Sequence, residues 1–266
     1  MIRCKKMAGS SYHCLYLSPH LDDVVLSCGG LIRKQTLAGE RVLVVTLFAG
    51  IPSYEHLSPF ARFLHLTWGN PPDLVGLRRL EDQAAIRSLE GDFLHLEFLD
   101  AIYRQDEGFL YESERALFGP LHPKDEPLKR ELLPLLERVA ERSGTPPIYA
   151  PLAVGHHVDH RIARRAADSL RRRGYPVTNY EDFPYVEREE ALLLALGARE
   201  EWSPTLEGIA DTIEEKVEAI ALYASQIFYL FRRKETMERR VRAYASGLAP
   251  ERGACERYWK PAQAMI

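Results

Sequence analysis

Apolar runs at intervals along the chain predict buried strands. Residues 41–48, RVLVVTLF, form a continuous run rich in β-branched side chains, which is typical of a strand covered on both faces of a parallel sheet. Residues 92–99, DFLHLEFL, alternate apolar and polar positions with a period of two, as a half-buried strand does. The further predicted strands are residues 13–18, 148–152 and 177–183.

Helical patterns separate these strands. The predicted helices are residues 23–38, 77–89, 126–143, 156–173 and 211–223. Strands that alternate with helices, with few hairpin signals, predict an α/β fold: a Rossmann-like, doubly wound and mostly parallel sheet with helices on both faces. Residues 191–196 are apolar but give no clear period, and the pattern is ambiguous from residue 245 onward.

The chain shows no internal repeat, low-complexity tract or clean linker. We therefore expect one domain over residues 1–266, with a C-terminal helical extension. Two long loops, at residues 49–70 and 101–123, interrupt the alternation of strands and helices. Loops of this length in compact domains are often functional, so we expect them to border an active site.

Charge and cysteine content narrow the class of protein. The 35 basic and 38 acidic residues give a net charge of −3, which argues against a protein built mainly to hold nucleic acid. The four cysteines have no CxxC spacing, so neither a cysteine zinc knuckle nor a disulfide framework is indicated. The N-terminus lacks the apolar run of a signal peptide, and no apolar span reaches the roughly 18 residues of a membrane helix. We expect a cytoplasmic protein without an integral membrane segment; a homo-oligomer stays open.

One imidazole and two carboxylates follow the first predicted strand. His20 and Asp23 are three residues apart, so one helical turn can direct both side chains at one point, and Asp22 lies between them. An imidazole and a carboxylate, joined by a third ligand from elsewhere, form a zinc site that keeps one position open for water. Read alone, His20 is equally a capping or core histidine, and Asp22 is equally a helix N-cap.

A second polar cluster follows the strand at residues 148–152. His157, Asp159 and His160 begin the next predicted helix, and His157 and His160 face the same side of its first turn. Because the carboxyl ends of parallel strands share one edge of a sheet, we expect both clusters to meet there. One histidine would ligate a metal ion while the other faces the substrate. Asp159 is equally a surface carboxylate.

These two clusters resemble the PIG-L/LmbE family of zinc-dependent N-deacetylases. The resemblance rests on His20-Leu21-Asp22-Asp23 with Gly29-Gly30, and on His157-Val158-Asp159-His160. The family usually has proline where Leu21 and Val158 stand, and neither position supplies a ligand. We expect the two glycines to let the helix approach the sheet closely.

Weaker matches extend the resemblance over residues 14–230. Arg78-Arg79-Leu80-Glu81-Asp82 is similar to a helix of the family, and Asp100 to Arg104 to one of its loops. A late segment with Lys216, Tyr223, Ser225 and Gln226 is also similar.

The resemblance implies roles for seven residues. His20, Asp23 and His160 would ligate one zinc ion per chain, or another divalent transition metal. Asp22 would be the general base. A charged His157 would stabilise the oxyanion and is also a candidate to protonate the leaving amine. Asp159 would orient His157 or raise its pKa, and Arg78 would bind a polar substrate group. From its position alone, Arg78 is equally a solvated helix arginine.

The resemblance implies a hydrolase that removes acetyl from a small N-acetylated amino sugar of the N-acetylglucosamine type. Aromatic loop residues are candidates for the wall of a sugar pocket, although packing explains each of them as well: Tyr54, Trp68, Tyr103 and Tyr111. A catalytically silent binding or regulatory domain is one alternative. A metal-dependent phosphoester hydrolase is another, but the sequence lacks the additional bridging carboxylates of a two-metal centre.

Overall fold

A seven-stranded mixed sheet organises the computed structural model, which describes residues 11–262. The strand order is β3-β2-β1-β4-β5-β7-β6. Five parallel strands form its main part: β1 Cys14–Ser18, β2 Val42–Thr46, β3 Asp92–His95, β4 Ile148–Pro151 and β5 Val177–Tyr180. The strands β6, Trp202–Gly208, and β7, Cys255–Pro261, extend it by antiparallel pairing.

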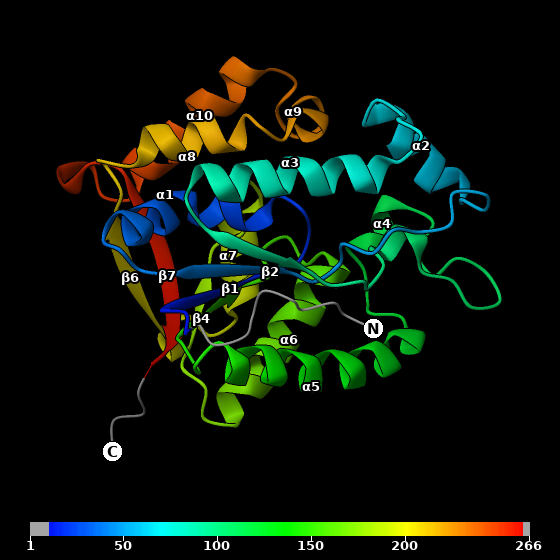
Figure 1. Ribbon diagram of the computed structural model, residues 1–266, viewed down its shortest axis with the longest axis horizontal. Helices are drawn as coiled ribbons and strands as arrows, with labels where there is room; N and C mark the ends of the chain where they lie inside the picture. Colours follow the sequence, from blue (N-terminus) through cyan, green and yellow to red (C-terminus); the bar gives the residue numbers. More distant parts are fainter. Residues whose placement is uncertain (1–10, 263–266) are drawn as a thin grey trace.

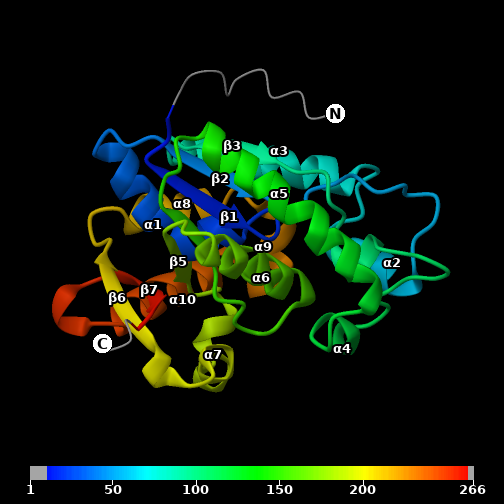
Figure 2. The same cartoon turned by 90° about the horizontal axis from the view of Figure 1, so that it is seen from below.

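Helices cover both faces of this sheet. Figure 1 shows α1 (Asp23–Leu37), α3 (Leu74–Ser88) and α8 (Ile213–Ile220) on one side, and α5 (Glu126–Arg142) and α6 (Val158–Arg172) on the other. In Figure 2, which views the molecule from below, α5 and α6 lie in front of the strands. The predicted doubly wound, mostly parallel α/β fold is confirmed. The remaining helices are α2 Pro59–Thr67, α4 Glu114–Leu117, α7 Glu189–Leu196, α9 Ala224–Phe231 and α10 Lys234–Gly247.

Alternating side chains of the central strand fill both layers of the core. Cys14 and Tyr16 of β1 pack into the cluster that contains α1 and α8, whereas Leu15 and Leu17 pack into the cluster that contains α5 and α6. Because successive strand residues point to opposite faces, both faces of β1 are apolar and buried. The continuous apolar runs in the sequence follow from this double coverage.

The glycine pair of α1 lies against the C-terminal part of the chain. A Cβ at Gly30 would lie 2.6 Å from Cδ1 of Ile209, and one at Gly29 would lie 3.1 Å from Cγ of Lys216. The Glu256 carboxylate accepts hydrogen bonds from the Gly30 backbone N–H at 2.9 Å and from Nζ of Lys216 at 2.7 Å. The close approach is therefore to residues of the C-terminal segment: it reaches the sheet at Glu256 of β7, while the nearest atoms belong to Ile209 and Lys216, which lie outside the strands.

The C-terminal extension is only partly helical, which corrects the prediction. It contains α8, α9 and α10, but it also contains β7, which pairs with both β5 and β6. The strand β6 reads WSPTLEG, and five of its seven positions are polar, proline or glycine because it lies at the edge of the sheet. The apolar segment at 191–196 belongs to α7.

In the described residues 11–262, no helix is both long and apolar enough to cross a membrane. Cys14, Cys28 and Cys255 are buried free thiols, in line with the absence of a predicted disulfide framework, while Cys4 lies outside the described residues. The N-terminal segment on which the signal-peptide expectation rests also lies mainly outside them.

Candidate metal centre and active site

Both polar clusters lie at the point where the strand order reverses. The central neighbours β1 and β4 run parallel, α1 follows β1 and α6 follows β4. In a doubly wound sheet the crevice at this reversal, beyond the carboxyl ends of the strands, is where ligands bind. The loops after the two strands therefore bring residues 20–23 and 157–160 together, as the sequence predicts.

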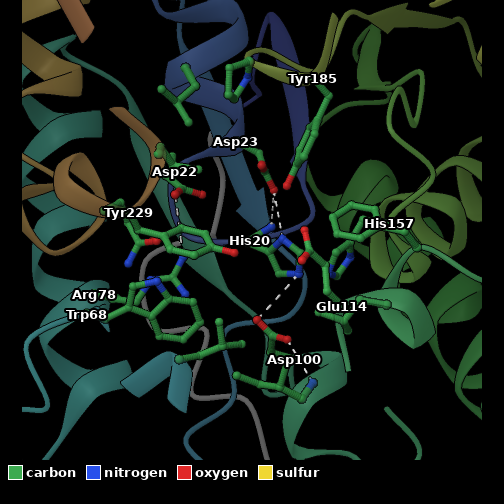
Figure 3. A pocket seen from close by; sticks show the side chains of 18 of the residues that line it. His20, Asp22, Asp23, Trp68, Arg78, Asp100, Glu114, His157, Tyr185 and Tyr229 are labelled. Carbon is green, nitrogen blue, oxygen red and sulfur yellow. Dashed lines mark hydrogen bonds and ion pairs between the residues drawn. The ribbon is translucent and has the colours of Figure 1, made fainter. Parts of the chain in front are cut away.

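One carboxylate oxygen lies at the same distance from the two candidate imidazole ligands. Oδ2 of Asp23 lies 3.3 Å from Nδ1 of His20 and 3.3 Å from Nε2 of His160. Figure 3 shows His20 and Asp23 pointing toward one another at the floor of a pocket. The side chains named by the sequence thus converge, although they come from loops and helices about 140 residues apart.

Outer carboxylates fix which nitrogen of each ring faces Asp23. Nε2 of His20 donates to Oδ2 of Asp159 at 2.9 Å, and Nδ1 of His160 donates to Oδ1 of Asp182 at 2.7 Å. The other ring nitrogen, which is Nδ1 in His20 and Nε2 in His160, faces Asp23. Nε2 of His160 is buried without a hydrogen-bond partner. Rings oriented by carboxylates, with a free nitrogen directed inward, are the usual arrangement of metal ligands. The residues fit a divalent metal ion.

His157 offers an alternative third nitrogen. One ring nitrogen each of His20, His157 and His160 lie within 4.8 Å of one another. However, Nδ1 of His157 accepts a hydrogen bond from the backbone N–H of Asp159 at 3.2 Å. A neutral ring that accepts at Nδ1 carries its proton on Nε2 and has no lone pair left there. This contact favours His157 as a hydrogen-bond donor and Asp23 as the third ligand.

The surrounding carboxylates govern the protonation of the two inner imidazoles. Burial by itself would lower the pKa of His20, yet Asp100 and two hydrogen-bonded carboxylates hold it well above its ordinary value. Burial acts in the same direction on His160, but Asp23 and Asp182 raise its pKa to about 10. Both rings are therefore cationic near neutral pH, and their charges hold the pKa of Asp23 well below its ordinary value against the effect of burial.

The Asp22 carboxylate is not used as a helix cap. It precedes α1 but makes no capping hydrogen bond, and Oγ of Ser18 instead accepts from the backbone N–H of Val24 at 3.2 Å. Asp22 has a φ of 151°, a conformation that is rare outside glycine and that recurs at functional sites. Burial and the charge of Asp23 raise the pKa of Asp22 to about 7, while Arg78 acts in the opposite direction.

His157 is uncharged, which corrects the expectation of a charged imidazole. Burial, followed by the positive charges of His20 and His160, holds the pKa of His157 well below its ordinary value. Its ring lies edge-on to His20 at 4.9 Å between centroids and lines the pocket. A neutral His157 with its proton on Nε2 is a hydrogen-bond donor directed at the same region as the metal centre.

The Asp159 carboxylate does not bond to the imidazole of His157, contrary to the expectation. It is fully buried, and besides His20 it accepts from Nη1 of Arg104 at 2.5 Å and from the backbone N–H of Ala101 at 3.0 Å. Only its charge acts on His157, where it opposes the lowering of the pKa. Asp159 thus orients His20, and the interpretation of Asp159 as a surface carboxylate is wrong.

Arg78 is buried in the wall of the pocket, so its interpretation as a solvated helix arginine is wrong. Its Nη2 lies 3.7 Å from Oδ2 of Asp22 and donates to the backbone oxygen of Leu21 at 3.3 Å. The guanidinium lies 5.3 Å from the ring centroid of Trp68. Arg78 holds the Asp22 loop and at the same time faces the cavity.

The weaker sequence matches meet between α3 and α9. The hydroxyl of Tyr223 donates to Oδ1 of Asp82 at 2.7 Å, and the backbone N–H of Ser225 donates to Glu81 at 2.9 Å. These bonds fix the start of α9, where buried Gln226 lines the pocket. The helix α3 and the start of α9, which are about 140 residues apart in sequence, therefore hold each other in place beside the site.

Sequence reasoning missed three residues of this region. Asp182 orients His160, Asp100 lies 3.7 Å from Nε2 of His20, and Tyr185 packs edge-on to His160 at 5.8 Å between ring centroids. Asp182 lies just beyond the end of β5, but the predicted strand at 177–183 ran past it, so its position at a strand end was hidden.

A cavity of about 240 Å³ opens above the metal centre. Of the four aromatic loop candidates, Trp68 lines it. The hydroxyls of the others bond elsewhere: Tyr54 to Asp73, Tyr103 to His65 and Tyr111 to Asp125. For those three the packing interpretation is the better one.

Comparison with known proteins agrees with this geometry. Residues 15–170 match the PIG-L family, described as GlcNAc-PI de-N-acetylase. The 2'-N-acetylparomamine deacetylase of Niallia circulans is 34% identical over 197 residues, which cover 67% of this chain and 70% of that protein. The enzyme of the same name from Streptomyces fradiae is 29% identical over 278 residues, covering 94% and 90%.

A solved structure extends the likeness to the whole fold. The zinc-inhibited form of teicoplanin deacetylase Orf2 superposes with a TM-score of 0.83 at 29% identity, covering 94% of this chain and 99% of that one. The fold and site define a hydrolytic N-deacetylase. The chain belongs to the PIG-L family.

Proposed function

We propose that this deacetylase removes the acetyl group from an amino sugar of the N-acetylglucosamine type, with His20, Asp23 and His160 as its metal ligands. The observation that carries the proposal is the convergence of two imidazole nitrogens on Oδ2 of Asp23, at 3.3 Å each. Relatives named for the deacetylation of 2'-N-acetylparomamine and of teicoplanin support the substrate class.

The donor set suits zinc or another divalent transition metal. Two imidazoles and one carboxylate are borderline ligands that leave such an ion with net positive charge and an open position. The bound ion would act as a Lewis acid on the acetyl carbonyl and stabilise developing negative charge.

Asp22 is proposed as the general base. A carboxylate with a pKa of about 7 is divided between its two protonation states near neutral pH, which suits a group that first takes and then returns a proton. Asp22 takes a proton from water as the water oxygen attacks the carbonyl carbon. When the C–N bond breaks, Asp22 returns that proton to the leaving nitrogen. The products are acetic acid and the amine, which exchange a proton in water to give acetate and the ammonium ion.

His157 is proposed as the donor to the oxyanion. The carbonyl oxygen becomes negative in the tetrahedral intermediate, so a hydrogen bond from Nε2 of His157 is stronger there than in the substrate. The lowered pKa of His157 makes it a hydrogen-bond donor rather than an acid, and this is why the leaving nitrogen is assigned to Asp22.

Three further residues are proposed to position this machinery. Asp159 orients His20, Asp182 orients His160, and Arg78 holds the loop of Asp22. We also propose that residues 1–266 act as one domain, because the C-terminal segment supplies both a strand of the sheet and part of the pocket wall.

The experiment is an acetate-release screen over N-acetylated sugars and glycoconjugates, with metal-loaded and chelator-treated protein and elemental analysis of the metal. We expect one metal ion per chain, acetate release from an N-acetylglucosamine derivative, and loss of activity with the chelator. Acetate release that persists after complete metal removal would contradict the metal-dependent proposal. Bound metal without acetate release from any substrate would favour the silent binding domain, and two ions per chain with phosphoester cleavage would favour the other alternative.

A further inference from the structure

The pocket changes character between its floor and its mouth. The floor holds charged and polar groups, among them His20, Asp22 and Asp23. The mouth is apolar and comes from two helices that are far apart in sequence. Phe60 and Phe63 of α2, with Trp68 just after it, join Tyr229 and Leu230 of α9 in one apolar surface, where the rings of Trp68 and Tyr229 pack edge-on at 5.8 Å between centroids. Figure 3 shows Trp68 and Tyr229 on the same side of the cavity, opposite His157.

Trp68 and Phe60 belong to or pack on a core cluster, but core packing does not account for the other two aromatic side chains at this mouth, Phe63 and Tyr229. Phe63 is 59% exposed and Tyr229 is 42% exposed, and Phe228 beside it is 56% exposed. Large apolar side chains that remain exposed in one contiguous patch mark a surface that another molecule covers. Here the patch is continuous with the candidate active site, so its occupant is part of the substrate.

The charges at the mouth argue against a polycationic occupant. Among the described residues that line the pocket, Glu114 is the one carboxylate outside the Asp22, Asp23 and Asp100 group at the floor. Aromatic faces also bind cations, but the guanidinium of Arg78 already lies over the ring of Trp68. At the mouth, an aglycone with several ammonium groups would find one carboxylate, whereas an apolar aglycone would find an aromatic surface.

We propose that the amino sugar carries an apolar aglycone, aromatic or acyl, that lies against the apolar surface formed together by α2 and α9 while the N-acetyl group reaches the floor. This inference rests on the proposed function for the position of the sugar. This surface covers the apolar part of the substrate, and the transfer of that part from water supplies binding free energy remote from the reacting bond.

A binding experiment tests the apolar site without turnover. Methyl and hexyl β-D-glucoside, neither of which has an acetamide to hydrolyse, are titrated into the full-length metal-loaded protein by calorimetry below micelle-forming concentrations. We expect the hexyl glycoside to bind at least tenfold more tightly. Equal affinities would overturn the proposal, whatever the outcome of the acetate assay. A hexyl preference without acetate release from any sugar would retain the apolar site and reject the proposed function.

A turnover experiment with matched variants locates the site. We expect kcat/KM to be at least tenfold higher for hexyl than for methyl N-acetyl-β-D-glucosaminide. Phe63→Ser should bring this ratio close to one. Leu66→Ser is the control, because Leu66 lies on the same helix and is 67% exposed but does not line the pocket. A ratio that Phe63→Ser leaves intact would overturn the assignment.

A polycationic aglycone is the alternative occupant, and it predicts a different result. The N-acetylated aminoglycoside 2'-N-acetylparomamine is assayed beside the hexyl glycoside, with wild type and Glu114→Gln. A higher kcat/KM for the aminoglycoside, lost in Glu114→Gln, would overturn the proposal. We expect the hexyl glycoside to be the better substrate and Glu114→Gln to leave the hexyl-to-methyl ratio unchanged.

Discussion

Asp182 accepts a hydrogen bond from Nδ1 of His160 at 2.7 Å and thereby decides that Nε2 of this ring faces Asp23. Oδ2 of Asp182 also accepts from the backbone N–H of Val154 at 2.8 Å, so the carboxylate is itself held in place. Buried carboxylates of this kind orient metal-binding rings and increase their basicity.

Replacing Asp182 tests this relationship. Asp182→Asn should lower metal affinity by about 10- to 100-fold while the fold is retained, because the ring loses its charged partner. The affinity is measured by competition with a chromogenic chelator. Asp211→Asn is the control, since Asp211 is an exposed carboxylate away from the site. Unchanged affinity in Asp182→Asn would show that the contact does not support a bound ion.

Asp22→Asn tests the general base. The amide has nearly the same shape and cannot take a proton, so we expect unchanged metal content and a loss of about 10²- to 10⁴-fold in kcat. Asp23→Asn serves as the contrasting variant and should lose bound metal as well as activity. An Asp22→Asn enzyme with a rate near that of wild type would refute the assignment of Asp22.

Metal binding should release protons. The pKa of His160 is raised to about 10 and that of His20 also lies above its ordinary value, so both rings are protonated at pH 7 and must lose a proton before they can ligate an ion. Apparent affinity should therefore rise with pH between about 6 and 9. Zinc titrations in buffers of different ionisation enthalpy would count the released protons. An affinity that stays constant over this range would contradict the expected charge states.

Gly30→Ala tests the contact between α1 and the C-terminal segment. The added Cβ would lie within 2.9 Å of three Ile209 atoms, one of them at 2.6 Å, so we expect a loss of about 1–3 kcal/mol in the free energy of unfolding. Denaturant titration gives the value. Gly247→Ala is the control, because a Cβ there meets nothing within 4 Å. A destabilisation no larger in Gly30→Ala than in this control would mean that the segment shifts without cost.

Local patterns were enough to predict the central sheet. The strands β1 and β2 are buried on both faces, so their apolar runs identify them without any knowledge of their neighbours. The same patterns failed for β6, because this edge strand has an exposed side and no continuous apolar run. They also failed for β7, an interior strand whose sequence, CERYWKP, mixes charged and aromatic residues without an apolar run. They also left residues 191–196 unassigned, because α7 spans only eight residues.

The sequence by itself determined that two histidine clusters lie at the same edge of the sheet, because the alternation of strands and helices predicts parallel strands and each cluster directly follows a strand. The tertiary structure decided which atoms of these clusters bond to one another. The bond of Asp159 to His20 spans 139 residues, and the mouth of the pocket joins α2 to α9. Such contacts depend on distances between elements, which no local pattern contains, and so the partner of Asp159, the charge of His157 and the apolar mouth emerged only from the fold.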